Sequence, residues 1–185
     1  MTRSRYELMD LTEAVELLRP LVEPGARSWA DIGAGEGGFT RALALLLGAG
    51  GTVYAVDPDH RAVKILQSLA VSPGGGLVVA VQGDLTGPLD LPVLDGALLA
   101  NSLHYVPDDQ QASSLARVAG LLKPGGRLVV AEYDGRPANP WVPYPVPFVR
   151  LRQIARDAGL SEPAMASHRP SAYGGILYLA VMQRA

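Results

Sequence analysis

The chain has 185 residues, of which 48% are apolar and 18% are charged, and its formal net charge is −2. This composition excludes a disordered or fibrous protein, and the lack of cysteine excludes disulfides, cysteine-ligated zinc and a thiol nucleophile. The charged first 20 residues and the glycine and proline breaks in the longest uncharged stretches predict a cytoplasmic chain without a membrane span, and the length predicts one domain over residues 1–185.

Apolar periodicity predicts helices and strands in alternation along the chain. The predicted helices cover residues 11–22, 39–47, 61–70, 112–122 and 148–158. The predicted strands cover residues 28–32, 52–56, 77–82, 94–100, 127–132 and 176–182. Asp10 with Glu13 has the form of a helix cap and its partner, Asp59 and His60 open a helix, and residues 123–126 form a turn. His168 falls in a connecting segment as a surface residue without a role.

The strands are apolar throughout, which is expected where helices cover both faces of a parallel sheet. We therefore predict an α/β fold with a doubly wound, Rossmann-like, mostly parallel sheet, helices on both faces and an antiparallel C-terminal strand. In such a sheet a ligand lies beyond the carboxyl ends of the central strands.

A glycine-rich loop follows the first predicted strand and opens the next helix. Gly33, Gly35 and Gly38 satisfy the dinucleotide pattern GxGxxG, and Asp57 ends the second strand, but this pattern alone is weak. Asp31 discriminates further, because its carboxylate would oppose a pyrophosphate and favour a ligand that carries an ammonium and a sulfonium. S-adenosylmethionine is such a ligand.

Here the chain resembles the class I S-adenosylmethionine-dependent methyltransferases, roughly from Trp29 to Tyr133. The residues that carry the resemblance are Asp31-Ile32-Gly33-Ala34-Gly35-Glu36-Gly37, Val56-Asp57-Pro58, Gln82-Gly83-Asp84-Leu85, the stretch 94–101 with 103–108, and Leu121-Leu122-Lys123-Pro124-Gly125-Gly126-Arg127-Leu128. The resemblance implies that S-adenosylmethionine is bound and that S-adenosylhomocysteine is the product. It assigns the methionyl part to the first motif, the ribose to the second and the adenine to the third. The implied cofactor-binding residues are Asp31, Gly33, Gly35, Gly37, Asp57, Pro58, Asp84, Leu85 and Asn101, while Asp84 also suits a simple turn.

Methyl transfer from a sulfonium is an in-line displacement, which requires alignment and a water-poor site but no metal and no covalent intermediate. For a protic acceptor a general base would help, and His104 is the candidate, although it could simply wall the cofactor pocket. Tyr105, Tyr133, Asp134 and Trp141 are the candidate substrate-binding residues. Trp141 lies in a Pro-rich segment, 135–150, which we expect either near the acceptor site or as a packed crossover. Residues 1–25 are predicted to form an N-terminal helix, and residues 1–10 are expected to fold over the cleft as a lid.

The expected partner is a small-molecule acceptor, methylated on oxygen, nitrogen or carbon. No nucleic acid is expected, because the six arginines between residues 136 and 185 do not form a dense run. The sequence does not define an oligomeric state. Two other functions stay open: a non-catalytic S-adenosylmethionine-binding module or subunit of a methylating complex, and an NAD(P)-dependent oxidoreductase, which Asp31, Asp84 and the lack of a hydride-transfer motif oppose.

Overall fold

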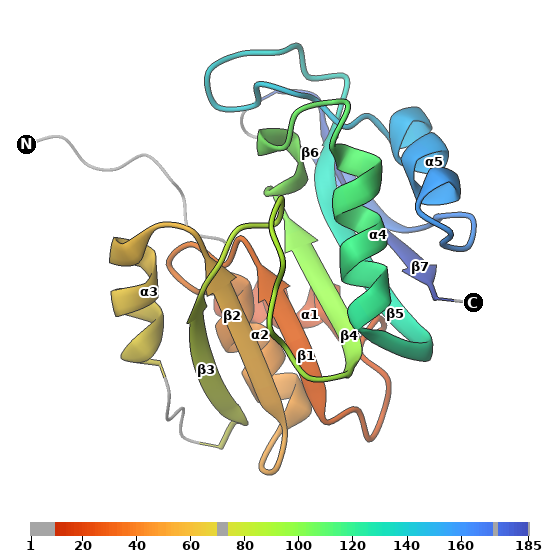
Figure 1. The fold of residues 1–185 in the computed structure, drawn as a ribbon. Coiled ribbons are helices and arrows are strands. Elements are labelled where there is room, and N and C mark those ends of the chain that lie inside the picture. Colours follow the sequence, from red (N-terminus) through yellow and green to blue (C-terminus); the bar gives the residue numbers. More distant parts are fainter. Residues whose placement is uncertain (1–9, 70–73, 172–173, 185) are drawn as a thin grey trace, which may run out of the picture.

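The central sheet holds seven strands within residues 10–69, 74–171 and 174–184, the part of the chain that this computed structural model describes (Figure 1). They are β1 (Ser28–Ile32), β2 (Thr52–Asp57), β3 (Leu77–Gln82), β4 (Leu94–Ala100), β5 (Leu122–Asp134), β6 (Ala164–Pro170) and β7 (Ile176–Gln183). Their order across the sheet is β3-β2-β1-β4-β5-β7-β6. The first five strands pair in parallel, and β7 is antiparallel to both neighbours. The predicted doubly wound sheet with an antiparallel C-terminal strand is confirmed.

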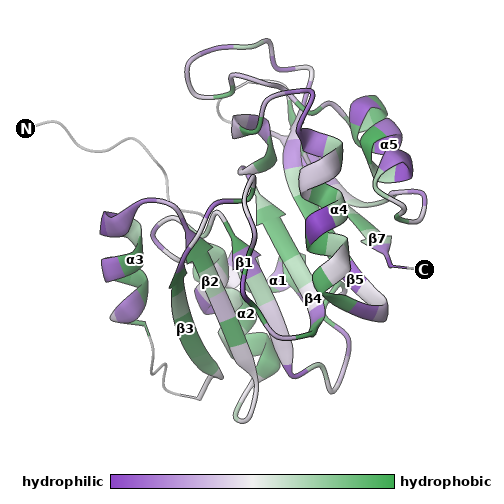
Figure 2. Ribbon diagram, in the orientation of Figure 1, coloured by the Kyte–Doolittle hydropathy of each residue, from purple (hydrophilic) through white to green (hydrophobic). Residues whose placement is uncertain are grey.

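Helices cover both faces of the sheet, as the apolar strands predict. They are α1 (Leu11–Leu18), α2 (Gly38–Leu47), α3 (His60–Gln67), α4 (Gln111–Leu121) and α5 (Phe148–Asp157), with a short 3-10 helix η1 (Leu103–Tyr105). Trp29 of β1 packs in one apolar layer with Leu43 of α2, and its neighbour Ala30 packs in the other with Leu115 of α4 and Ile154 of α5. Figure 2 shows the apolar strands at the centre and mixed polarity on the outer helices. Alternate strand residues thus serve two separate cores.

A close contact between β1 and β4 explains one glycine of the sheet. Trp29 is 1% exposed and is paired in register with Gly96. A Cβ atom at Gly96 would lie 2.3 Å from two carbon atoms of the Trp29 ring, so no other residue leaves room for the indole there. The largest side chain of the core therefore depends on the smallest residue of β4.

The right-hand part of the sheet differs from the prediction in two places. Residues 123–126, predicted as a turn, belong to β5, because Gly125 N donates to Arg184 O and Arg184 N donates to Gly126 O. The register between β4 and β5 shifts there, which marks an irregularity. The predicted connecting segment before residue 176 contains β6, whose mainly exposed residues lack an apolar run. His168 is on the surface as predicted, but it lies in that strand.

The helix ends differ modestly from the sequence patterns. Helix α1 ends at Leu18 rather than near residue 22, and α3 ends at Gln67, while residue 70 lies outside the described part. Asp10 caps α1 and Asp59 caps α3, as predicted. Glu13 was predicted to complete the first cap, but it pairs with Arg169 of β6 instead. The predicted lid over the cleft falls mostly on residues 1–9, which the structure does not describe.

The fold brings the carboxyl ends of β1, β2, β4 and β5 to one edge of the sheet, at the top in Figure 1. The glycine loop after β1 and the helix η1 after β4 both lie at this edge. Among the described residues, no helix combines the length and the apolar character needed to cross a membrane.

Candidate active site

The glycine loop is fixed to the neighbouring strand by its own backbone. Gly33 N and Ala34 N both donate to Val56 O, at 2.8 and 3.0 Å. Gly33 has a φ of +81°, and a Cβ atom there would lie 2.4 Å from Cβ of Ser102, just after β4. Both features require glycine at this position. The loop therefore lies directly against the segment that leads into η1.

Gly35 and Gly37 serve this loop in different ways. Gly35 has a φ of +54°, its N–H donates to Oδ2 of Asp57 at 2.8 Å, and no atom lies within 4 Å of a Cβ built on it. Gly37 precedes α2 with a φ of +82°, and a Cβ there would lie 2.5 Å from Cδ1 of Leu69. Gly35 thus leaves open space beside the backbone, which a ligand could use. Gly37 is favoured by its positive φ and by the close approach of Leu69, and a cofactor contact at Gly37 stays a prediction.

Asp57 ends β2 and is only 8% exposed. Its Oδ2 accepts from Gly35 N, and its Oδ1 accepts from Asp59 N at 2.9 Å. An ionised carboxylate can accept about four hydrogen bonds, so two positions remain for hydroxyl groups such as those of a ribose. Pro58, the next residue, is exposed.

Asp31, the residue before the end of β1, carries a carboxyl group that is almost entirely buried, with 1% exposure. Its Oδ2 accepts from the hydroxyl of Thr40, in α2, at 2.6 Å. Burial and, to a lesser degree, the nearby charge of Asp57 raise the pKa of Asp31 to about 6, against the hydrogen bond from Thr40 that lowers it. A buried carboxylate of this kind fits a cation, because an ammonium would offset the cost of its charge.

The end of β4 shows two further features of a ligand site. Asn101 has a φ of +53°, a conformation that few residues other than glycine adopt, and its N–H donates to Ala131 O at 2.9 Å. Oδ1 of Asn101 and Oγ of Ser102 are buried and have no hydrogen-bond partner in the described part of the protein. Buried polar atoms usually have partners, so these two fit a polar ligand such as the amino-acid end of S-adenosylmethionine.

Asp84 and Leu85 follow β3, as the third motif requires. Oδ1 of Asp84 accepts from N and Oγ1 of Thr86, both at 2.8 Å, so the turn geometry predicted as the alternative is present. Asp84 is exposed, and Leu85 is 8% exposed within the apolar core. Adenine recognition by these two residues stays a prediction.

The candidate base, His104, lies in η1 and is 2% exposed. Its Nδ1 is 2.7 Å from Oε2 of Glu132, and its backbone N donates to Oε1 of the same carboxylate at 3.1 Å. Glu132 lies in β5 with no exposed surface. One carboxylate therefore holds both the ring and the main chain of His104.

The candidate substrate-binding residues surround His104 to different degrees. The ring centroids of Tyr105 and Tyr133 lie 4.5 and 6.2 Å from that of His104. Asp134 ends β5 opposite Ile176 of β7, one residue beyond Tyr133. Trp141 is 63% exposed in a turn whose ends are Asn139 and Val142, and it precedes Tyr144, whose N–H donates to His104 O, by three residues.

Three of the residues that complete the site were not found by sequence reasoning. Glu132 ends an apolar run of β5, and a single carboxylate in such a run is a signal that could have identified it. Thr40 and Ser102 carry no comparable signal, because hydroxyl residues are common in helices and loops. Their roles follow only from the contacts of α2 with β1 and of the glycine loop with β4.

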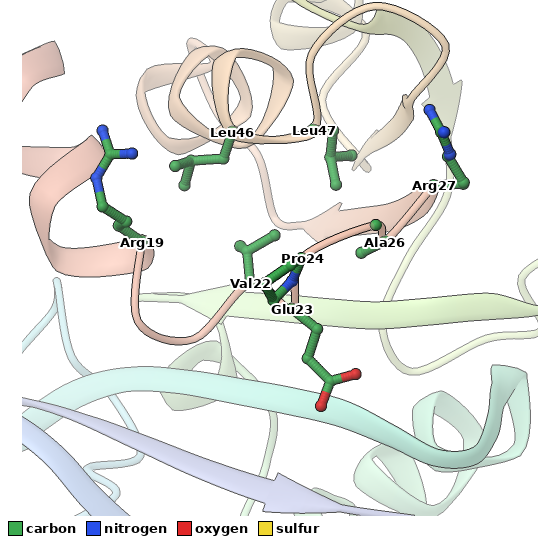
Figure 3. A pocket seen from close by; sticks show the side chains of 9 residues that line it. Arg19, Val22, Glu23, Pro24, Ala26, Arg27, Leu46 and Leu47 are labelled. Atoms are coloured by element: carbon green, nitrogen blue, oxygen red, sulfur yellow. The ribbon is translucent and has the colours of Figure 1, made fainter.

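A pocket of about 420 Å³ lies elsewhere, between the segment after α1 and the end of α2 (Figure 3). Its lining residues are Arg19, Val22, Glu23, Pro24, Gly25, Ala26, Arg27, Leu46 and Leu47. Seven of them lie between α1 and β1, while Leu46 and Leu47 end α2. All nine lie at the opposite edge of the sheet and include none of the predicted site residues. The candidate active site is therefore the carboxyl edge rather than this pocket.

Fold and site together define a Rossmann-like nucleoside-binding domain with a glycine loop and two acids at the ends of adjacent strands. Residues 30–130 match the methyltransferase domain family. The chain therefore belongs to this family of S-adenosylmethionine-dependent methyltransferases, as its motifs indicated.

Individual relatives are similar over part of their length. The ubiquinone/menaquinone biosynthesis C-methyltransferase UbiE of Ectopseudomonas mendocina is 34% identical over 121 residues, which are 64% of this chain and 46% of that protein. The ribosomal RNA large subunit methyltransferase E of Stutzerimonas stutzeri is 30% identical over 154 residues, which are 72% of this chain and 66% of that protein. The chain thus spans about half to two thirds of the length of these curated relatives.

Solved structures agree with the fold. An S-adenosylmethionine-dependent methyltransferase from Aquifex aeolicus has a TM-score of 0.74 at 20% identity, covering 100% of this chain and 94% of that one. The 1,6-didemethyltoxoflavin-N1-methyltransferase of Burkholderia thailandensis, solved with its substrate and S-adenosylhomocysteine, has a TM-score of 0.70 at 23% identity, covering 95% and 78%. At these identities the likeness supports the fold.

Proposed function

We propose that this chain methylates a small protic acceptor, a hydroxyl or an amine, with His104 as the general base and Glu132 as the residue that orients it. The observation that carries the proposal is the buried His104–Glu132 pair. His104 lies two residues after Ser102, which contacts the glycine loop at Gly33. S-adenosylmethionine, when bound, supplies a methyl group already activated on a sulfonium. The chain has to hold this cofactor, position the acceptor and remove one proton.

The hydrogen bonds of Glu132 define which nitrogen of His104 acts. A carboxylate only accepts hydrogen bonds, so Nδ1 of His104 carries the hydrogen and Nε2 presents its lone pair. Nε2 is then the atom that receives the acceptor proton, and the negative charge of Glu132 stabilises the resulting imidazolium. The second bond, from His104 N to the same carboxylate, keeps the ring from turning away.

The residues that would hold the cofactor are those whose contacts leave room for it. Asp31 would face the ammonium, Asp57 the ribose hydroxyls, and Asn101 and Ser102 the remaining polar groups of the amino-acid end. The open space beside Gly35 would admit the ligand to the backbone of the loop. A nicotinamide dinucleotide fits less well, because its pyrophosphate would meet the Asp31 carboxylate.

The aromatic side chains near His104 favour a flat, partly apolar acceptor molecule. Tyr105 is 53% exposed although its ring is 4.5 Å from the His104 ring, and Trp141 is 63% exposed. The cation of Arg136 lies 4.7 Å from the centroid of Tyr133. Aromatic side chains with few rotatable bonds bind flat acceptors at a small entropic cost.

The similarity to ribosomal RNA methyltransferases raises nucleic acid as an alternative acceptor, but this alternative is less well supported. A basic binding face needs arginines available to phosphates. Most arginines of the C-terminal part are instead engaged within the protein: Arg136 over Tyr133, Arg150 with Gln111 and Asp108, Arg152 with Glu162, Arg169 with Glu13, and Arg184 with main-chain carbonyls. This supports a small molecule as the acceptor.

The cofactor is tested by thermal unfolding with S-adenosylhomocysteine and, separately, NAD. A ligand at 100 times its dissociation constant stabilises by about 2.7 kcal/mol, which corresponds to roughly 5–10 °C in a domain of this size. We expect this shift with S-adenosylhomocysteine and none with NAD, and a smaller shift in Asp57→Ala. The opposite pattern would exclude the proposed cofactor.

The base is tested by single-turnover methyl transfer in a screen of phenols, amines and carbon acids. His104→Gln should slow transfer to a hydroxyl or amine by about 10²-fold or more, the usual contribution of general base catalysis. His168→Gln is the matched control, because His168 is an exposed histidine in β6. Equal rates in His104→Gln and the control would remove His104 as the base. S-adenosylhomocysteine binding without transfer to any acceptor would favour the non-catalytic module.

A further inference from the structure

A buried amide side chain connects three segments around the candidate active site. Gln111, the first residue of α4, has no exposed surface. Its Nε2 donates to Val106 O at 3.2 Å and to Tyr144 O at 3.3 Å. Its Oε1 accepts from Nε of Arg150, in α5, at 3.1 Å. This side chain therefore joins the segment after η1, the Pro-rich segment and α5.

The peptide at Tyr144 is held on its other side by the candidate base. Tyr144 N donates to His104 O at 3.0 Å, while Tyr144 O accepts from Gln111. Two residues later, Val146 O accepts from the hydroxyl of Tyr178, in β7, at 2.6 Å. The end of the Pro-rich segment is thus anchored at the carbonyls of Tyr144 and Val146, and the N–H of Tyr144 adds a bond to the main chain of His104.

The position of Gln111 is one where packing alone would favour an apolar residue. A fully buried amide is tolerated only when it is hydrogen-bonded, since an unpaired one costs about 1–3 kcal/mol. Each partner of this amide lies outside α4: Val106 just after η1, Tyr144 in the Pro-rich segment and Arg150 in α5. Its contacts therefore set the separation between these segments.

We propose that Gln111 is a positioning residue for the acceptor: it holds the Pro-rich segment at a fixed distance from His104. This inference rests on the proposed methyltransferase function of the same site. Without the amide, Tyr144 loses its link through Gln111 to Val106, two residues beyond the base, and keeps only the bond from its N–H to His104 O. His104 itself stays in place, because Glu132 holds it through two hydrogen bonds. The expected effect is a weaker hold on the acceptor with an unchanged base.

The test compares Gln111→Glu with wild type. Glutamate keeps the volume and the contact with Arg150, but its carboxylate cannot donate to the carbonyls of Val106 and Tyr144. Hydrogen exchange of the Tyr144 amide should accelerate at least tenfold, whereas exchange in the core of β5 and the dissociation constant of S-adenosylhomocysteine should stay within twofold. With 4-nitrocatechol as acceptor, KM should rise about tenfold and kcat should change less than threefold.

Two further variants separate positioning from simple loss of stability. Arg150→Met removes the contact to Oε1 and keeps both donations to the carbonyls, so Tyr144 exchange should stay near wild type. Gln111→Met replaces the amide with an apolar side chain of similar size and should reproduce the Gln111→Glu effects. It serves as the test if Gln111→Glu proves too unstable to measure.

The outcomes distinguish this inference from the proposed function. Unchanged Tyr144 exchange in both Gln111 variants would overturn the inference, and so would an equal loss of S-adenosylhomocysteine affinity, which would indicate a general structural role. A wild-type protein that binds S-adenosylhomocysteine but never methylates 4-nitrocatechol would count against the proposed acceptor class. In that case the exchange comparison still decides whether Gln111 holds the segment.

Discussion

The replacement Asp31→Asn should stabilise the free protein while it weakens cofactor binding. Asp31 is buried in the sheet, and the hydroxyl of Thr40 is its hydrogen-bond donor. Burial first, and the charge of Asp57 second, raise its pKa from 3.8 to about 6. Above that pH the folded protein carries a buried charge that the unfolded chain hydrates freely. Asparagine keeps an oxygen for Thr40 and removes the charge.

The magnitude follows from the size of the pKa shift. A shift of about two units corresponds to about 3 kcal/mol, since one unit is 1.36 kcal/mol. The N–H groups of the new asparagine amide cost about 1 kcal/mol if they stay unpaired, so the net gain in the free energy of unfolding is about 2 kcal/mol. The folded state binds the extra proton between pH 3.8 and about 6, so wild type loses stability as the pH rises through this window. The advantage of the variant should be small near pH 4 and complete above pH 7.

Urea unfolding at pH 4.5 and pH 7.5 measures this difference, and calorimetry at pH 7.5 measures S-adenosylhomocysteine binding. We expect the variant to be more stable than wild type by about 2 kcal/mol at pH 7.5 and to bind the ligand at least tenfold more weakly. Asp95→Asn is the control with the opposite sign. Hydrogen bonds from Lys123 and from the main chain lower the pKa of Asp95 against its desolvation, so this control should lose stability at pH 7.5 and bind normally. Lower stability of Asp31→Asn at pH 7.5, or unchanged ligand affinity, would refute the reasoning.

Two more changes test the loop and the base. Gly33→Ala should destabilise the protein by at least about 2 kcal/mol and abolish S-adenosylhomocysteine binding, because its Cβ would collide with Ser102 at a φ of +81°. Gly35→Ala has open space and should cost only about 1 kcal/mol in urea unfolding, with weaker binding; equal costs for both would contradict the loop geometry. Glu132→Gln should lower kcat about tenfold or more in the acceptor assay while S-adenosylhomocysteine affinity is kept, because the variant no longer stabilises a charged His104; an unchanged kcat would mean that the pair only supports the fold.

The sequence was sufficient for the parts of the fold that rest on local patterns. Apolar runs such as Val53–Val56 identify buried parallel strands, because both their faces are covered. The pattern failed at β6, where Ala164–Pro170 is mainly exposed and pairs with β7 on one side only. It also failed at Gly125, whose place in β5 depends on a hydrogen bond with Arg184, 59 positions away in the chain.

The site shows the same division between local and distant causes. The sharp turn at Gly33 and Gly35 and the place of Asp57 at the end of β2 could be predicted, because glycine-rich loops and strand ends carry a signal in the sequence. The binding of a cofactor by these residues stays a prediction. The pairing of His104 with Glu132 could not be predicted, since Glu132 lies on another strand and only the parallel pairing of β4 with β5 brings it close. Gln111 is similar, because its three partners come from segments that are separate in sequence.

The two buried acids at the carboxyl edge argue that this edge is built for a reaction rather than for stability. Asp31 and Glu132 lie near the ends of β1 and β5, and both are almost completely buried. A buried carboxylate usually contributes less to stability than an apolar residue of the same size. Asp31 accepts a hydrogen bond from the hydroxyl of Thr40, and Glu132 is hydrogen-bonded to the ring of His104. Each carboxylate therefore remains able to interact with a cation or a proton. They flank the end of β4, where Asn101 and Ser102 present buried atoms that have no partner among the described residues. The proposed site for positive charge therefore lies on one side of β4 and the proposed proton acceptor on the other, a placement that supports the proposed methyl transfer to a protic acceptor.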